Sequence, residues 1–383
     1  MRLLYLTADP GVPVLGHKGG SVHVRELATA LSHIGAEVAI ASPRIEPAGD
    51  SLDATIGLLP IPRVVPDASA RDLRTALEAQ RSAVLEHARR FDAEAIYERF
   101  SLFSDAGVEA AAALRIPHVL EVNAPLREEA RRFRTLPHPA LAGEIERAVY
   151  RGSGRLLAVS PALKRWLEAE GVKPERVEVV PNAVAPERFE LRRRRRKSAF
   201  VVGFCGSLKA WHGIEVLLEA CATAFAEEPS LRLEVVGSGP LEHLLCVPGV
   251  PADRLVACGA VSHAEAIQRL RGWDAGVAPY LPLDDFYFSP LKVLEYMAAG
   301  LCPVASDLGE LPALLGQGDR GVLVPAGEAD ALAAALVELA QAPGRADELG
   351  RRARTHVLKA HTWERNARVV LDSLRGGSRE LAA

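Results

Sequence analysis

The chain begins each of its halves with the same order of expected elements. Leu3–Ala8 is an apolar run typical of a buried strand, and a loop rich in Gly and Pro, Asp9–Gly20, separates it from a helical pattern. Phe200–Cys205 starts the same order again and is followed by the loop Gly206–Gly213 and a second helical pattern. A strand, a crossover helix and a second strand form a βαβ unit with parallel strands. The sequence therefore predicts an α/β fold with two doubly wound, Rossmann-like domains.

Helical and strand patterns alternate along the rest of the chain. Apolar residues at helical spacing, such as Val24, Leu27 and Leu31, predict amphipathic helices, and short apolar runs predict buried strands. The further expected helices are Ser21–Gly35, Arg71–Arg90, Asp105–Leu114, Arg127–Tyr150, Pro161–Gly171, Ala329–Ala342 and Ala346–Ala360. The further expected strands are Glu37–Ser42, Ala95–Glu98, His118–Val122, Arg155–Ser160, Val177–Val180 and Leu231–Val236.

A run of basic residues, Arg192–Lys197, separates the two halves. Like charges cannot pack against one another, so the run indicates an exposed linker. We therefore expect a first domain over residues 1–185, a linker over 186–198 and a second domain over 199–360. The alternative interpretation of the run is weak peripheral contact with an anionic membrane or a lipid-linked acceptor.

The bulk composition excludes several classes of protein. The formal net charge of −3 gives no support for nucleic-acid binding. The five cysteines form no CxxC pair, which favours reduced core residues of a cytoplasmic protein over disulfides or a zinc site. No apolar run approaches the roughly 18 residues that span a bilayer, and the first residues do not form a signal peptide. We expect a soluble protein that at most contacts the inner face of a membrane.

The stretch Phe286–Ser306 (FYFSPLKVLEYMAAGLCPVAS) predicts a loop, a short helix and a buried strand. Ser289 is placed to cap the helix, and Pro290 fits its first turn. Gly300 is placed to end the helix, and Cys302–Ala305 is apolar enough for a core strand. The start of such a helix offers free amides and a positive dipole end, which suit a phosphate.

One acidic residue follows in this helix. Glu295 lies about two turns after the expected cap, and a carboxylate there can accept both hydroxyls of a ribose. A diphosphate on the amides of Leu291 and Lys292, with a ribose near Glu295, would make a nucleotide-sugar site. The plainer alternative is a structural helix that happens to contain one Glu.

A second stretch favours the nucleotide-sugar interpretation. Residues 204–218 read FCGSLKAWHGIEVLL, and together with the stretch above they resemble the donor-binding half of retaining GT-B glycosyltransferases of family 4. The resemblance implies two domains facing each other across a cleft, with a final helix over residues 361–383 that packs back on the first domain. It also implies transfer of a sugar from a nucleoside-diphosphate sugar to an acceptor with retention of anomeric configuration.

The resemblance carries donor-binding roles to particular residues. A Gly-Gly pair such as Gly19 and Gly20 contacts the donor diphosphate in the family, and the alternative is a loop that needs positive φ. The family pattern GRLxxxKG falls on residues 206–213, where Ser207 replaces the usual Arg and His212 the usual Lys. We expect Lys209 to supply the positive charge for the leaving group, with His212 assisting when protonated.

Two further family positions concern the sugar. Glu295 corresponds to the second Glu of the E-x7-E motif, whereas the first falls at Tyr287, with Asp284 or Asp285 as possible substitutes. Asn123 lies where many relatives have a His after a strand, and its amide is expected to hydrogen-bond the transferred sugar as part of the catalytic set.

Three residues are candidates for the acceptor side. Arg99, Glu121 and Arg127 follow or end strands of the first half. For Arg99 and Glu121 a structural ion pair is an equal alternative. His23 lies one turn into a helix, where a packed or capping role is the more common one.

The sequence contains no D-x-D pair, the usual acidic holder of a divalent cation in the other major glycosyltransferase fold. We therefore expect transfer without a metal or another cofactor, in the synthesis of a glycolipid, polysaccharide or small-molecule glycoside. Two other functions remain open on the same fold. One is a nucleotide-sugar epimerase, and the other is a nucleotide-sugar sensor without catalysis, since the usual Arg, Lys and first Glu are absent.

Overall fold

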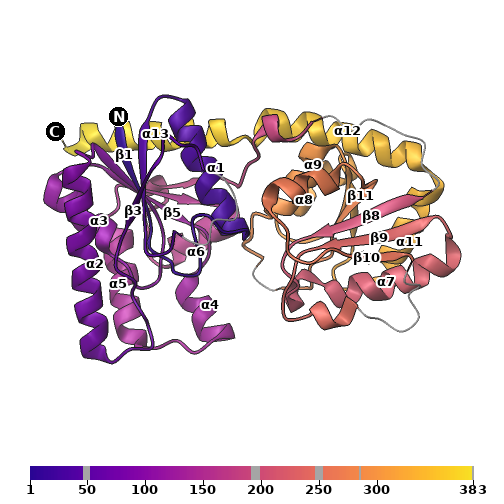
Figure 1. Cartoon of the computed structure of the whole chain (residues 1–383), viewed down its shortest axis with the longest axis horizontal. Coiled ribbons are helices and arrows are strands. Elements are labelled where there is room, and N and C mark those ends of the chain that lie inside the picture. Colours follow the sequence, from indigo (N-terminus) through magenta and orange to yellow (C-terminus); the bar gives the residue numbers. More distant parts are fainter. Residues whose placement is uncertain (46–51, 191–198, 246–252, 284–285, 382–383) are drawn as a thin grey trace. The chain divides into compact units, whose positions relative to one another are not determined.

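The computed structural model describes the chain apart from residues 46–51, 191–198, 246–252, 284–285 and 382–383. The chain forms two compact units (Figure 1). The first unit contains Met1–Pro181, Tyr287–Ser289 and Trp363–Ala383, and the second contains Asn182–Phe286 and Pro290–Thr362. The basic run Arg192–Lys197 and the pair Asp284 and Asp285 lie outside the described residues.

The first unit is built on a seven-stranded parallel sheet, with strand order β3-β2-β1-β4-β5-β6-β7. Its strands are β1 (Arg2–Thr7), β2 (Glu37–Ser42), β3 (Gly57–Pro60), β4 (Ala95–Arg99), β5 (His118–Val122), β6 (Arg155–Ala158) and β7 (Val177–Val179). β1 and β5 are buried along almost their whole length because helices cover both faces of the sheet. The strand order reverses between β1 and β4, which is where doubly wound sheets bind ligands.

Helices surround this sheet (Figure 1). They are α1 (Gly19–His33), α2 (Ala70–Arg90), α3 (Ala106–Leu114), α4 (Leu126–Phe133), α5 (Pro139–Gly152), α6 (Pro161–Ala169) and α13 (Trp363–Leu381). The last helix, α13, packs along α1 and on β5, and the Asn366 amide donates to the carbonyl of Pro181 at 2.8 Å. Helix α13 is therefore part of the first unit.

The second unit contains a six-stranded parallel sheet, with strand order β10-β9-β8-β11-β12-β13. Its strands are β8 (Phe200–Cys205), β9 (Leu231–Val236), β10 (Leu255–Ala257), β11 (Ala275–Ala278), β12 (Cys302–Ser306) and β13 (Val322–Val324). Its helices are α7 (Ile214–Glu227), α8 (His263–Leu270), α9 (Leu291–Ala299), α10 (Leu311–Leu314), α11 (Ala329–Gln341) and α12 (Pro343–Ala360). Here the strand order reverses between β8 and β11. The predicted α/β fold with two Rossmann-like units is confirmed.

Some element boundaries differ from the predicted ones for local reasons. The expected single helix over Arg127–Tyr150 is two helices, because Pro139 occupies the first turn of α5 and the backbone of His138 is left-handed. Helix α1 begins at Gly19, two residues earlier than expected. Helix α9 has Pro290 as its N-cap residue, so Ser289 is not the cap and the prediction was displaced by one residue. Gly300 ends α9 with φ of 74°, as predicted.

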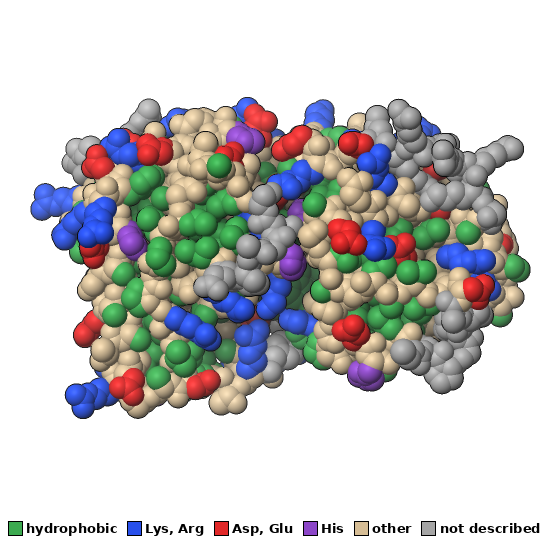
Figure 2. All heavy atoms as spheres, in the orientation of Figure 1, with side chains coloured by type: hydrophobic (Ala, Val, Ile, Leu, Met, Phe, Trp, Pro, Cys, Tyr) green, Lys and Arg blue, Asp and Glu red, His purple; other side chains and the backbone are tan. Residues whose placement is uncertain are grey.

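The surface of each unit carries charges of both signs. On the face in Figure 2, acidic and basic side chains lie among apolar ones on both units. Within the described part of the chain, no helix combines the length and the apolar character needed to cross a bilayer.

Candidate functional site

In the second unit, α9 packs on β11 and β12, and the Lys292 side chain at its start reaches Gly206, which follows β8 at the reversal point of the sheet. The first hydrogen bond of the helix is donated by the Val293 amide to the Pro290 carbonyl at 3.1 Å, so the amides of Leu291 and Lys292 precede it. No acidic residue lies in the first turn. This helix start has the amides and the positive dipole end that bind a phosphate.

Helix α9 is held on the sheet by Tyr296. A Cβ at Gly276 of β11 would lie 2.4 Å from the ring, so the absence of a side chain lets the ring lie on the strand. The Tyr296 hydroxyl accepts a hydrogen bond of 2.8 Å from the amide of Cys205, the last residue of β8. The fully buried ring therefore fixes the position of α9 against both strands that flank the reversal point.

The Lys292 side chain extends from this helix start into an aromatic environment. Its Nζ lies 4.1 Å from the centre of the Phe204 ring and 5.4 Å from that of Tyr280. The Nζ atom is buried and has no hydrogen-bond partner in the described part of the chain. Burial disfavours the ammonium form and lowers the pKa of Lys292 to about 7.

The loop that follows β8 carries His212 and Lys209, the two residues that we expected to supply positive charge. His212 Nδ1 donates to the Ser207 carbonyl at 2.5 Å, and Ser207 itself is exposed. Burial, together with the charges of Lys292 and Lys209, lowers the pKa of His212 to about 3. His212 is therefore neutral at pH 7, so the expectation that a protonated His212 assists the leaving group is wrong at this pH. The Lys209 Nζ lies over the Trp211 ring at 4.6 Å.

Glu295 is paired, which the sequence did not indicate. Its Oε1 lies 2.6 Å from Nε2 of His263, the first residue of α8, and both side chains are largely buried. Ser262 precedes this His and caps α8 by accepting from the Glu265 amide. Nothing in the spacing of the two residues, 32 positions apart, predicts this contact. It orients the Glu295 carboxylate and leaves Oε2 as an acceptor for a hydroxyl.

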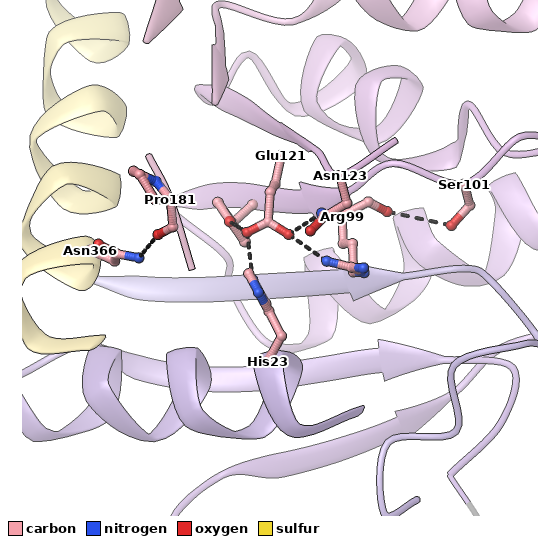
Figure 3. A network of polar contacts seen from close by, with 8 residues as sticks. His23, Arg99, Ser101, Glu121, Asn123, Pro181 and Asn366 are labelled. Atoms are coloured by element: carbon pink, nitrogen blue, oxygen red, sulfur yellow. Dashed lines mark hydrogen bonds and ion pairs between the residues drawn. The ribbon is translucent and has the colours of Figure 1, made fainter. Parts of the chain in front are cut away.

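In the first unit, Glu121 near the end of β5 is the centre of a polar network (Figure 3). The carboxylate lies 2.6 Å from His23 Nε2 on one side and 2.7 Å from Arg99 Nη1 on the other. The Tyr97 hydroxyl and the Asn123 amide also donate to it. The predicted alternative of an Arg99–Glu121 ion pair is confirmed. His23 is buried and pairs with Glu121 instead of capping its helix.

The charges of this network depend on one another. Burial favours the neutral form of Glu121, but the His23 and Arg99 charges and the Tyr97 hydrogen bond outweigh it and hold its pKa well below the usual range. Because the carboxylate only accepts hydrogen bonds, Asn123 must turn its Nδ2 toward Glu121. The Oδ1 of Asn123, which is half-buried, is then left to accept from a ligand hydroxyl.

The other predicted residues of the first unit, Gly19, Gly20 and Arg127, do not bond to the Glu121 carboxylate in the hydrogen bonds described here. Gly19 and Gly20 form the first turn of α1, and neither has positive φ, so the alternative of a loop that needs positive φ is wrong. A Cβ at Gly20 would lie 3.6 Å from Arg99 Nη2. Arg127 pairs with Glu146 at 2.6 Å and with Glu170 at 2.9 Å.

Tyr287, where the family has its first Glu, belongs to the first unit together with Ser289. Its hydroxyl donates to Glu129, and its carbonyl accepts from the Ser160 hydroxyl at 2.7 Å. A phenol that is already bonded to a carboxylate replaces the family's acidic side chain at this position.

Comparison with known families matches both halves of the chain. The model of Glycosyltransferase Family 4 matches residues 17–188, and that of Glycosyl transferases group 1 matches residues 199–342. The chain belongs to glycosyltransferase family 4. The family resemblance drawn from the sequence is therefore confirmed, and the chain is a glycosyltransferase.

Relatives of this glycosyltransferase include two curated enzymes. It is 34% identical to phosphatidyl-myo-inositol mannosyltransferase of Mycolicibacterium smegmatis over 47% of each chain, so it spans about half the length of that relative. It is 26% identical to D-inositol 3-phosphate glycosyltransferase of Paenarthrobacter aurescens over 98% of this chain and 97% of the other.

Solved structures share the fold. Sucrose-phosphate synthase from Thermosynechococcus elongatus has a TM-score of 0.74 at 18% identity, with 98% of each chain covered. Anabaena HepE in complex with UDP-glucose has a TM-score of 0.72 at 16% identity, covering 97% of this chain and all of the other. These similarities confirm the GT-B class of the fold.

We expect Gly276→Ala to lower the free energy of unfolding by about 1–3 kcal/mol, because the new methyl group overlaps the Tyr296 ring. Urea unfolding monitored by circular dichroism measures the change. Gly344→Ala is the matched control, because a Cβ there meets no atom within 4 Å. Equal stability of the Gly276→Ala protein and the wild type would show that the ring does not depend on this glycine.

We expect Glu121→Gln to destabilise the protein by about 3–5 kcal/mol, because it leaves the buried charge of Arg99 without its partner. Tyr97→Phe removes one hydrogen bond to the same carboxylate and should cost only about 1 kcal/mol. Urea unfolding of both variants at pH 7 tests the difference. Similar losses in the two variants would contradict a central role for the charge.

The lowered pKa of Lys292 predicts a pH dependence of stability. Its folded value of about 7 lies below the ordinary value of 10.5, so the unfolded chain binds more protons between these values. The free energy of unfolding should therefore rise with pH across this window. Urea midpoints of the wild type and Lys292→Met are compared at pH 7 and pH 10. The wild type should gain stability relative to the variant as the pH rises, because only the wild type has the lysine that titrates. Parallel profiles would contradict the assignment.

Proposed function

We propose that this glycosyltransferase moves a hexose-type sugar from a nucleoside-diphosphate sugar to an acceptor with retention of anomeric configuration. The observation that carries the proposal is the start of α9. The backbone amides of Leu291 and Lys292 and the Glu295 carboxylate lie there, at the edge where a doubly wound sheet binds nucleotides. These groups match, in order, the diphosphate and the ribose of such a donor.

Sugar transfer requires this site to stabilise the departing nucleoside diphosphate. When the bond from the sugar C1 to the diphosphate oxygen breaks, negative charge develops on that oxygen. The new bond forms from C1 to the acceptor oxygen, and the acceptor hydroxyl gives its proton to the departing diphosphate. The helix amides of Leu291 and Lys292 stabilise the developing charge, and Glu295 holds the ribose through Oε2. We extend the proposal to transfer without a metal, since the sequence lacks a D-x-D pair.

The first unit is proposed to bind the acceptor and the transferred sugar. Asn123 presents Oδ1 as an acceptor for a sugar hydroxyl, and Gly19 and Gly20 leave the first turn of α1 open to the ligand. The names of the relatives suggest an inositol or another phosphate-bearing polyol as acceptor, and the bound ligand of HepE suggests UDP-glucose as the first donor to try. We place the enzyme in the cytoplasm, with peripheral membrane contact if the acceptor is a lipid.

The test is an assay of donor consumption with UDP-, GDP-, ADP- and dTDP-sugars and with inositol or inositol phosphate, in EDTA and in Mg²⁺. We expect one donor to release its nucleoside diphosphate only with an acceptor, equally in both conditions, and proton NMR to show a product with the donor's anomeric configuration. Glu295→Ala should lower kcat/KM by at least tenfold, because the ribose loses its acceptor.

Glu338→Ala is the control, because it removes an exposed carboxylate of α11 in the same unit. Conversion of the donor without an acceptor would instead identify an epimerase. Tight binding of a nucleotide sugar without any turnover would identify a sensor. Either result would contradict the proposed transfer.

A further inference from the structure

The Lys292 side chain is a buried group that the site described above does not yet use. The proposed role of Lys292 involves its backbone amide, whereas its Nζ is buried among aromatic rings without a hydrogen-bond partner in the part of the chain described. An isolated cation is costly to bury, and lysines normally keep the ammonium group in water. A lysine held in this way indicates a counter-ion that arrives from outside the protein.

The Nζ lies beside the loop that follows β8. A Cβ on Gly206, the first residue of that loop, would be only 2.8 Å from Nζ. Gly206 also has φ of 149°, a left-handed value that favours glycine. The lysine is therefore placed between this loop and the start of α9, beside the amides that are proposed to bind the diphosphate.

The groups that face Lys292 include one anion, Glu295, which is already paired with His263. They are Phe204, Cys205, His212, Tyr280 and Glu295. Burial raises the pKa of Cys205 to about 12, so its thiol is neutral, and burial also raises the pKa of Tyr280. Glu295 is the anion among these five groups, and its Oε1 is already bonded to His263.

The Arg and the Lys of the family pattern are missing from the loop after β8, where Lys209 stays a predicted cation. Ser207 replaces the Arg of the family pattern, and His212, which replaces the Lys, is neutral at pH 7. A diphosphate that binds to the start of α9 still needs a positive partner when it leaves the sugar. Lys292 is a primary amine that can carry this charge, on the helix that already supplies the amides.

We propose that Lys292 Nζ is the cation that pairs with the donor diphosphate, in place of the Arg and Lys of the family pattern. The proposal rests on the proposed function and names a residue for its leaving-group step. Above pH 7 the amine of the empty site is mostly neutral, and the diphosphate favours the ammonium form. Binding therefore takes one proton from solvent to Nζ, with no covalent change.

The experiment is isothermal titration calorimetry of the wild type with UDP, GDP, ADP and dTDP at pH 8, where the terminal phosphate of the nucleotide is already ionised. Each titration is repeated in buffers of different ionisation enthalpy, because the difference gives the number of protons taken up. For the nucleotide that binds best, we expect uptake approaching one proton in the wild type.

Lys292→Met should bind this nucleotide at least tenfold more weakly and take up no proton. Lys292→Arg, whose charge is permanent, should recover part of the affinity without proton uptake, a combination that a merely structural lysine would not give. Lys359→Met is the matched control, because it removes an exposed lysine of α12. It should leave both affinity and proton uptake unchanged. Circular dichroism and the melting temperature confirm that each variant is folded.

The outcomes separate this inference from the proposed function. If the wild type binds a nucleoside diphosphate but Lys292→Met binds it equally well or still takes up the proton, the role of Lys292 is overturned and the donor site stands. If the wild type binds none of the four nucleotides, the proposed function fails and the inference falls with it.

Discussion

The packing of Tyr296 against Gly276 is the contact on which the second unit's site depends. The ring lies on β11, and its hydroxyl accepts the amide of Cys205 at the end of β8, so the helix is fixed against both strands of the reversal point. Lys292 and Glu295 extend from that helix. Their positions relative to the loop after β8 follow from this one buried ring, because a short helix cannot shift while the ring is enclosed.

Glu121 has the corresponding position in the first unit. It is a buried carboxylate with four donors, from α1, β4 and the residue that follows β5. Its charge fixes the orientation of the Asn123 amide and holds Arg99 beside the first turn of α1. In both units a buried interaction near the strand ends orients the polar groups that a ligand would meet. The two units thus hold polar side chains near the strand ends of their sheets through different buried contacts.

The sequence predicted the fold class and, within one residue, the helix start of α9, because apolar periodicity and capping residues are local signals. It did not predict the pairs His23–Glu121 and His263–Glu295, whose members are 98 and 32 positions apart and meet only through the sheet order. Nor did it predict that His212 is neutral, since its pKa depends on burial and on Lys292. A histidine at this position suggested a positive charge, but burial and the nearby Lys292 favour its neutral form.

The central claim is that the start of α9 binds the diphosphate of a nucleotide sugar. A crystal structure of the enzyme with the best-bound nucleoside diphosphate tests it most directly. The account predicts phosphate oxygens within hydrogen-bond distance of the Leu291 and Lys292 amides and of Lys292 Nζ, with the ribose hydroxyls on Glu295 Oε2. A nucleotide bound elsewhere in the second unit, with Lys292 still enclosed by Phe204 and Tyr280, would contradict it.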